Sequence, residues 1–102
     1  MTVEIISKPL YQIFTDLTQE PRIEVALWLA VKDWLRLRLK EARSAQEQFE
    51  QRYGLLFAGF KLAWEAGQVP DAYSYPVERD HWEWEATVTD MERLTQMWES
   101  LL

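Results

Sequence analysis

The sequence predicts a single all-α domain over residues 1–102, with a long central helix, an antiparallel C-terminal helix along it, and two short helices. Apolar side chains recur at steps of three and four through most of the chain, which is the period of amphipathic helices. One such pattern runs unbroken from Pro21 to Gly54, and 102 residues is a usual length for one domain. With 48% hydrophobic residues and six tryptophans, the chain has more apolar surface than one small core buries, so we expect oligomerisation to complete the helical bundle.

A short first helix is predicted from about Pro9 to Leu17. Proline is well tolerated in a first helical turn, and the apolar residues after it keep helical spacing. These residues are Leu10, Ile13, Phe14 and Leu17. The segment Val3 to Ile6 is rich in β-branched residues and lies outside this period, so a brief strand there is the alternative interpretation.

The second predicted helix has Pro21 in its first turn and ends at Tyr53, where Gly54 can adopt the left-handed conformation that ends many helices. At 1.5 Å per residue this helix would be roughly 50 Å long, so its distal half needs a packing partner. The segment Val25 to Val31 is apolar on every side and is expected to be buried. Beyond it the apolar residues narrow to a stripe of Trp28, Val31, Leu35, Leu39, Ala42, Gln46, Phe49 and Tyr53.

A third, short helix is expected from Phe57 to Trp64, stopped by Gly67. Together with the first helix it is predicted to close the wide apolar end of the long helix. The segment Val69 to Pro76 indicates a loop anchored by aromatic side chains. Asp80, with Glu83 three residues later, matches a capping box, so the last helix is predicted to start there and to continue to the end of the sequence.

The last predicted helix has large apolar side chains at seven-residue intervals. These are Trp84, Met91 and Trp98, and with Val88, Thr95 and Leu102 they form a seam with steps of four and three. Such a seam is typical of helix pairing, as in a coiled coil. A second apolar edge on the same helix consists of Trp82, Leu94, Met97 and Leu101. Two interpretations stay open: the seam is ordinary core, or it is an intermolecular contact, which the second edge favours.

Charge is unevenly distributed along the chain, whose formal net charge is -6. Residues 78–102 contain seven acidic and two basic residues, whereas residues 21–53 contain seven basic and five acidic ones. A basic row on one side of the long helix consists of Lys32, Arg36, Lys40 and Arg43. This row could be solvated surface, could pair with the acidic last helix of the same or a second chain, or could bind phosphates.

Several functional classes are disfavoured by composition. A net negative charge argues against nucleic-acid or anionic-membrane binding, and the absence of cysteine excludes disulfides and thiolate chemistry. His81 and Glu85 could offer two metal ligands from one helix face, but no second histidine completes a site. We find no arrangement of nucleophile and base, and therefore expect no enzymatic activity, no cofactor and no metal. The apolar runs are too short to span a bilayer, so we expect a soluble, cytoplasmic protein.

The run from Phe49 to Ala86 carries a pattern found in a known group of proteins. Its segments are Phe49-Glu50-Gln51-Arg52-Tyr53-Gly54, then Phe60 with Trp64-Glu65-Ala66-Gly67, then Tyr75-Pro76-Val77-Glu78-Arg79-Asp80-His81-Trp82-Glu83-Trp84-Glu85-Ala86. It resembles small, acidic, mostly helical antitoxins of bacterial and archaeal toxin–antitoxin pairs, including those beside TumE-like toxins. The resemblance implies a toxin as partner.

Two functional hypotheses follow from the exposed acidic and aromatic pattern. The leading one is a non-enzymatic module that binds a basic protein, such as an RNA-acting toxin, and occludes it. The contact residues predicted for it are Trp82, Trp84, Glu85, Met91, Glu92, Trp98 and Glu99. The alternative is a self-associating helical homodimer that serves as a scaffold, in which this seam meets the basic row of a second chain. DNA binding for autoregulation is a minor third hypothesis.

Overall fold

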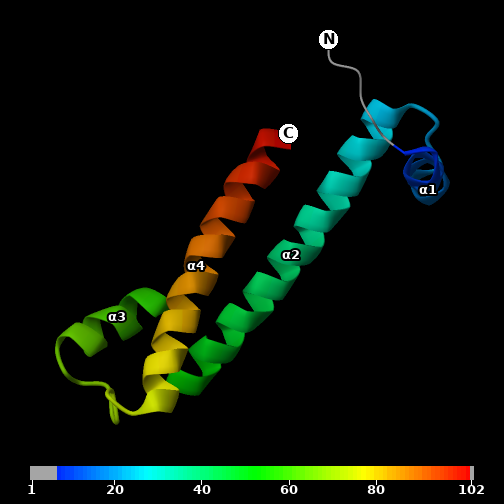
Figure 1. Ribbon diagram of the computed structural model, residues 1–102. Coiled ribbons are helices and arrows are strands. Elements are labelled where there is room, and N and C mark those ends of the chain that lie inside the picture. Colours follow the sequence, from blue (N-terminus) through cyan, green and yellow to red (C-terminus); the bar gives the residue numbers. More distant parts are fainter. Residues whose placement is uncertain (1–6, 102) are drawn as a thin grey trace.

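The computed structural model describes residues 7–101 and, within them, contains helices and no strand (Figure 1). The four helices are α1 (Lys8–Thr18), α2 (Ile23–Tyr53), α3 (Phe57–Glu65) and α4 (Tyr75–Leu101). The predicted all-α fold is confirmed. The alternative strand from Val3 to Ile6 lies outside the described residues. None of the described helices is both long enough and apolar enough to cross a membrane.

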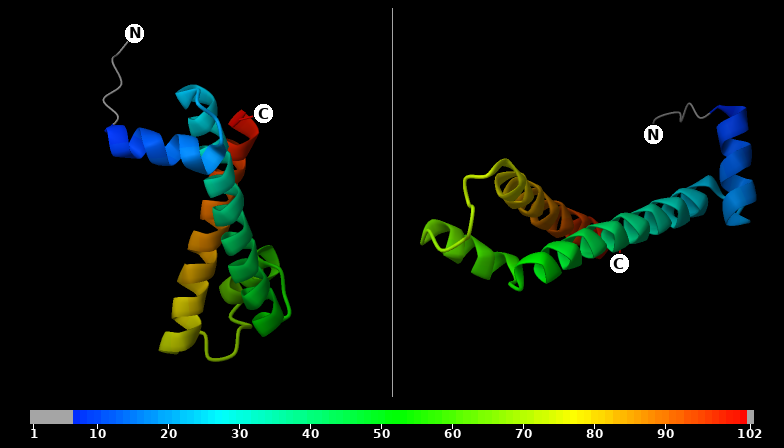
Figure 2. Two further views of the ribbon diagram at one scale, coloured as in Figure 1. Left: turned by 90° about the vertical axis from the view of Figure 1, so that its right-hand side faces the viewer. Right: turned by 90° about the horizontal axis from the view of Figure 1, so that it is seen from below.

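The two long helices lie side by side in antiparallel orientation, as predicted, and make an elongated molecule (Figures 1 and 2). Tyr53 at the end of α2 contacts Asp80 near the start of α4, while Lys32 near the start of α2 lies 6.0 Å from the ring of Trp98 near the end of α4. The molecule measures 56 × 25 × 25 Å with a radius of gyration of 19.7 Å. A compact domain of about 100 residues has a radius of gyration near 13 Å, so this chain is a rod rather than a globule.

Most helix ends follow the signals in the sequence. The Ser7 hydroxyl accepts a hydrogen bond from the Leu10 N–H at 3.3 Å and caps α1, which contains Pro9 in its first turn. Gly54 has φ 67° and its N–H donates to the Glu50 carbonyl at 2.7 Å, which ends α2 as predicted. Helix α2 begins at Ile23, so Pro21 precedes the helix instead of occupying its first turn.

The start of α4 was predicted incorrectly. The helix begins at Tyr75, one turn and a half before the predicted capping box, and its Glu78 N–H already donates to the Ser74 carbonyl at 3.0 Å. Pro76 therefore lies inside the first turn, where proline does not disrupt a helix. Asp80 is consequently an interior helix residue with a buried side chain, and it cannot cap the helix.

The core lies at the end of the rod where α2 ends, and α3 packs there against the first half of α4. The buried residues of this cluster are Phe49, Phe60, Val69 and Trp84. The Trp84 ring is the centre of the cluster, with ring centroids of Phe60 at 4.9 Å and Phe49 at 5.5 Å. Stacked and tilted aromatic pairs at these distances stabilise the folded state by more than the burial of their apolar area alone.

The other end of the rod is open. We predicted Val25 to Val31 to be buried, yet Ala26 is the only fully buried residue among them. The reason is the position of the short helices. Helix α1 crosses the start of α2, whereas α3 packs at the opposite end of α2, so the two do not close one apolar end together (Figure 2). Leu27, Trp28 and Val31 are left exposed.

Candidate protein-binding surface

A buried carboxylate fixes α4 against α2 at the core end. The Asp80 Oδ2 accepts hydrogen bonds from the Arg52 Nη1 and from the Tyr53 hydroxyl, both at 2.7 Å. Burial raises the pKa of Asp80, but the hydrogen bonds from Tyr53 and Arg52 and the nearby positive charge outweigh burial and hold that pKa below its ordinary value. Burial and the hydrogen bond to Asp80 raise the pKa of Tyr53 to about 12. This network sets the register between the two long helices.

The predicted contact residue Trp84 does not lie on the surface. Its side chain is 0% exposed and is enclosed by aromatic rings from α2 and α3. The interpretation of this position as ordinary core is therefore correct, and Trp84 cannot contact a partner while the chain is folded. Trp82, only two residues away, points to the other side of α4 and is 61% exposed.

The residues that α4 buries differ in part from those of the predicted seam. Leu94, which we placed on the second edge, is fully buried, while Thr95 of the predicted seam is exposed. Met91 and Trp98 are half-buried, and Met97 is exposed. The packing of α4 along α2 within one chain thus uses part of each predicted edge and leaves Trp82 and Met97 free on the outside.

An acidic strip runs along the outer side of α4 at seven-residue steps and consists of Glu78, Glu85, Glu92 and Glu99. Glu85, Glu92 and Glu99 are exposed. His81 lies 3.8 Å from Glu85. Neither Glu92 nor Glu99 forms an ion pair with any described residue. By contrast, the remaining acidic residues of α4 lie near arginines: Asp80 near Arg52, Glu83 near Arg79, and Asp90 near Arg38 and Arg93. The unpaired negative charge of this helix is therefore concentrated on its outer side.

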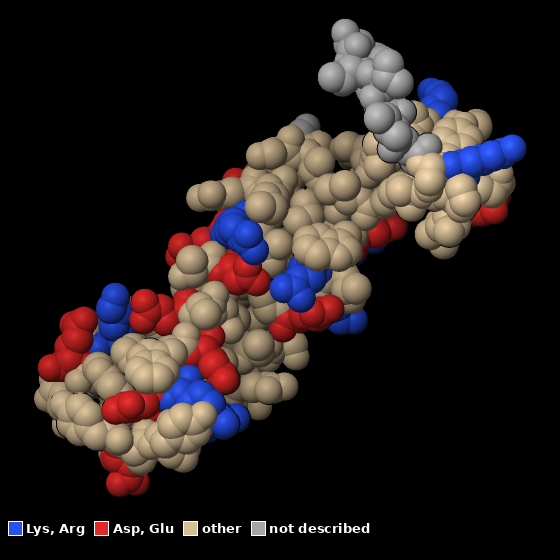
Figure 3. Space-filling model, viewed as in Figure 1, with Lys and Arg blue, Asp and Glu red and all other residues tan. Residues whose placement is uncertain are grey.

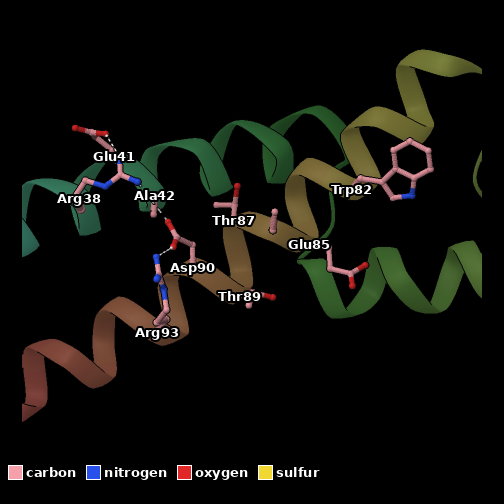
Figure 4. Close-up of a pocket in the computed structure, with 10 residues that line it drawn as sticks. Arg38, Glu41, Ala42, Trp82, Glu85, Thr87, Thr89, Asp90 and Arg93 are labelled. Carbon is pink, nitrogen blue, oxygen red and sulfur yellow. Dashed lines mark hydrogen bonds and ion pairs between the residues drawn. The ribbon is translucent and has the colours of Figure 1, made fainter.

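A groove of about 820 Å³ lies between α2 and α4, next to Trp82 and Glu85 (Figure 4). Its floor contains small side chains such as Ala42 and Ala86, and one end holds a chain of charges in which Arg38 and Arg93 both approach Asp90. An open groove with a small-residue floor and an aromatic edge can accept a side chain or a helix from a partner. We did not predict it, since it depends on how far apart the two helices pack.

The predicted basic row is mostly surface. Arg36, Lys40 and Arg43 are exposed, and Arg36 lies 3.5 Å from Asp33 of the same helix. Lys32 is half-buried because its ammonium lies over the rings of Trp28 and Trp98, at 4.7 Å and 6.0 Å. The ion pair between α2 and α4 uses Arg38, which does not belong to the row, and Asp90 at 3.7 Å. Arg38 was missed because it projects from the side of α2 opposite to the row.

His81 packs against the aromatic residues of the core. Its ring centroid lies 4.4 Å from that of Trp64 and 5.6 Å from that of Phe60. Over residues 7–101 the structure contains no cluster of three or more His, Asp or Glu side chains that could hold a metal ion.

No family model, no curated protein and no solved structure matches this chain.

Proposed function

We propose that this protein is a non-enzymatic protein-binding module whose partner presents a basic surface to the outer side of α4. The observation that supports the proposal best is the acidic strip. Its exposed carboxylates at Glu92 and Glu99 form no ion pair with a described residue, and Glu85 lies within one helical turn of the exposed Trp82. Following the resemblance described above, we propose that the partner is an RNA-acting toxin and that binding neutralises it by occlusion.

Charged and aromatic side chains contribute differently to the binding of a partner. Exposed carboxylates steer a basic partner and raise the association rate, while each exposed ion pair contributes only about 0.2–1 kcal/mol. Residence time depends instead on burial of apolar side chains at the centre of the interface, where tryptophan is a frequent hot spot. Trp82, which lies within one helical turn of Glu78 and Glu85, is an exposed apolar side chain of α4 that can serve this role. Figure 3 shows how acidic and basic residues alternate with uncharged surface on one face of the rod.

Co-expression with the product of the neighbouring open reading frame tests the proposal. We expect the two proteins to co-purify, and we expect the double variant Glu92→Lys and Glu99→Lys to weaken binding at least tenfold at low salt. The matched control is Glu47→Lys with Glu65→Lys, which changes the net charge equally at exposed positions on α2 and α3. The control should bind as the unaltered chain does.

Two outcomes contradict the proposal. The first is that the neighbouring protein does not co-purify and its effect on RNA is unchanged by this chain. The second is that both double variants weaken binding equally, because net charge and not the acidic strip would then govern the interaction.

A further inference from the structure

Helix α2 has a second apolar stripe whose larger side chains are mostly exposed. It consists of Ile23, Leu27, Ala30, Trp34 and Leu37, with steps of four, three, four and three. Leu27 is 36%, Trp34 57% and Leu37 53% exposed. Trp34 precedes the buried Leu35 by one residue, so it points about 100° away from the side of α2 that packs on α4. We call these five residues the α2 stripe.

The steps of the α2 stripe are those of a helix-pairing seam. Alternating intervals of four and three keep apolar residues on one side of a helix over successive turns, as a second helix requires. The surroundings of the stripe are also under-packed. Helix α1 lies beside it, and none of its eleven residues, all within the described part of the chain, is buried. Leu10, Ile13 and Leu17 of α1 remain exposed.

We propose that the α2 stripe pairs with the same stripe of a second copy of this chain, in antiparallel orientation about a twofold axis near Lys32. The proposal concerns a different surface from the acidic strip and does not rest on the proposed function. A basic partner is disfavoured here because Arg38 and Lys40 flank the stripe. A twofold interface is self-complementary, which a single stripe of this kind can satisfy.

Side-chain sizes favour the antiparallel alignment. With the axis near Lys32, Leu27 faces Leu37 of the second copy, and Ala30 faces Trp34 of the second copy. Each of these two layers then combines a small with a large side chain or two of medium size, which fills space evenly, while Ile23 at the end of the stripe faces Glu41 of the second copy. A parallel alignment would place Trp34 against Trp34 and Ala30 against Ala30, leaving one layer overfilled and the next one with a void.

Charge favours the same alignment. Glu24 and Arg38 lie on the same flank of the stripe, fourteen residues apart, so an antiparallel pair brings Glu24 of each copy toward Arg38 of the other, whose guanidinium also approaches Glu41 and Asp90 of its own chain. On the opposite flank the two Asp33 carboxylates approach each other, and the Arg36 guanidinium 3.5 Å from each of them offsets their repulsion. Because each chain has a net charge of -6, an antiparallel dimer also keeps the acidic first halves of the two α4 helices at opposite ends.

Sedimentation velocity of the full chain over a concentration series tests the association. We expect a reversible dimer whose dissociation constant rises at least tenfold in Trp34→Ala. The matched control is Trp82→Ala, which removes an equally exposed indole from α4 outside the stripe. It should leave the dissociation constant unchanged, and far-UV circular dichroism should show native helix content in both variants. A chain that stays monomeric, or a Trp82→Ala effect as large as that of Trp34→Ala, overturns the proposal.

Cross-linking through introduced cysteines tests the orientation. Because the sequence contains no cysteine, no native thiol reacts. We expect Leu27→Cys and Leu37→Cys chains to react with a short bismaleimide only when mixed, because each position faces the other across an antiparallel pair. Cross-linking of either variant with itself but not with the other would show a parallel pair and refute the alignment. Both experiments use the isolated chain, so their failure is distinguishable from failure of the proposed function.

Discussion

Two tryptophans separated by one residue have opposite roles in α4. Trp84 is enclosed in the core, whereas Trp82 is largely exposed at the edge of the groove. The alternation follows from helix geometry, because residues two apart point about 200° apart around the axis. The sequence predicted that this helix has two apolar edges. It did not predict which edge packs within the chain, since α2 offers apolar side chains to either.

Asp80 shows the same limit for a polar residue. The spacing of Asp80 and Glu83 matched a capping box, yet in the structure Asp80 is a buried acceptor for Arg52 and Tyr53. A single sequence contains no signal for this role, because the donors lie 27 and 28 residues away. The pairing exists only once α2 and α4 are in register.

We predict that this network makes stability fall at both ends of the pH range. The pKa of Asp80 is lowered in the folded state, so its contribution is present above about pH 4 and is lost as the pH falls through the folded pKa. The pKa of Tyr53 is raised to about 12, so its contribution is present below about pH 10 and is lost as the pH rises toward 12. Urea denaturation followed by circular dichroism at successive pH values measures both losses.

Tyr53→Phe separates the two effects. This variant removes the hydroxyl that donates to Asp80 and should lower the free energy of unfolding at neutral pH by about 1–2 kcal/mol. It should also lose less stability than the unaltered chain between about pH 10 and 12. An unchanged alkaline loss in Tyr53→Phe would show that other groups cause it.

At the scale of elements, the helix-ending glycine was the most reliable signal in the sequence. Gly54 ends α2 at the predicted residue, because its left-handed backbone conformation is unfavourable for side chains with a Cβ. The start of α4 was less predictable. Tyr75 and Pro76 resemble loop residues locally, but the first turn of a helix tolerates proline, and packing of Val77 against the core extends the helix to Tyr75.

Two glycine substitutions should change stability in opposite directions. Gly54→Ala places a side chain at φ 67° and should destabilise by about 1–2 kcal/mol, although nothing lies within 4 Å of the new Cβ. Gly59→Ala lies inside α3, where the Cβ would meet Leu55 Cδ2 at an ordinary 3.6 Å, and should stabilise by roughly 0.5–1 kcal/mol. Thermal denaturation of both variants gives the comparison, and two changes of the same sign would contradict it.

At the scale of the whole molecule, the rod has a packed end and an open end. Aromatic residues from α2, α3 and α4 fill the packed end, while α1 and the first half of α2 expose apolar surface at the other. Such a distribution predicts that stability varies along the rod, since local opening is easiest where few apolar side chains are buried.

Hydrogen exchange measured by mass spectrometry tests this gradient. We expect amides of α1 to exchange fastest among the helices, amides of the first half of α2 at an intermediate rate, and amides around Trp84 slowest. Within residues 7–101, one hydrogen bond joins α1 to the residues that immediately precede α2. In it, the Tyr11 hydroxyl donates to the Pro21 carbonyl at 2.9 Å. Protection of α1 equal to that of the segment around Trp84, at concentrations where the chain is monomeric, would contradict the gradient.

The sequence alone determined the helical class, the approximate extent of three helices and the concentration of negative charge on α4, because these depend on periodicity, glycine and proline positions, and local composition. Only the tertiary structure decided that Trp84 is core while Trp82 is surface, that Asp80 is a buried acceptor, and that α1 and α3 lie at opposite ends of the rod. Those features depend on the register between α2 and α4. That register is set by contacts between residues far apart in the chain, which local patterns do not encode.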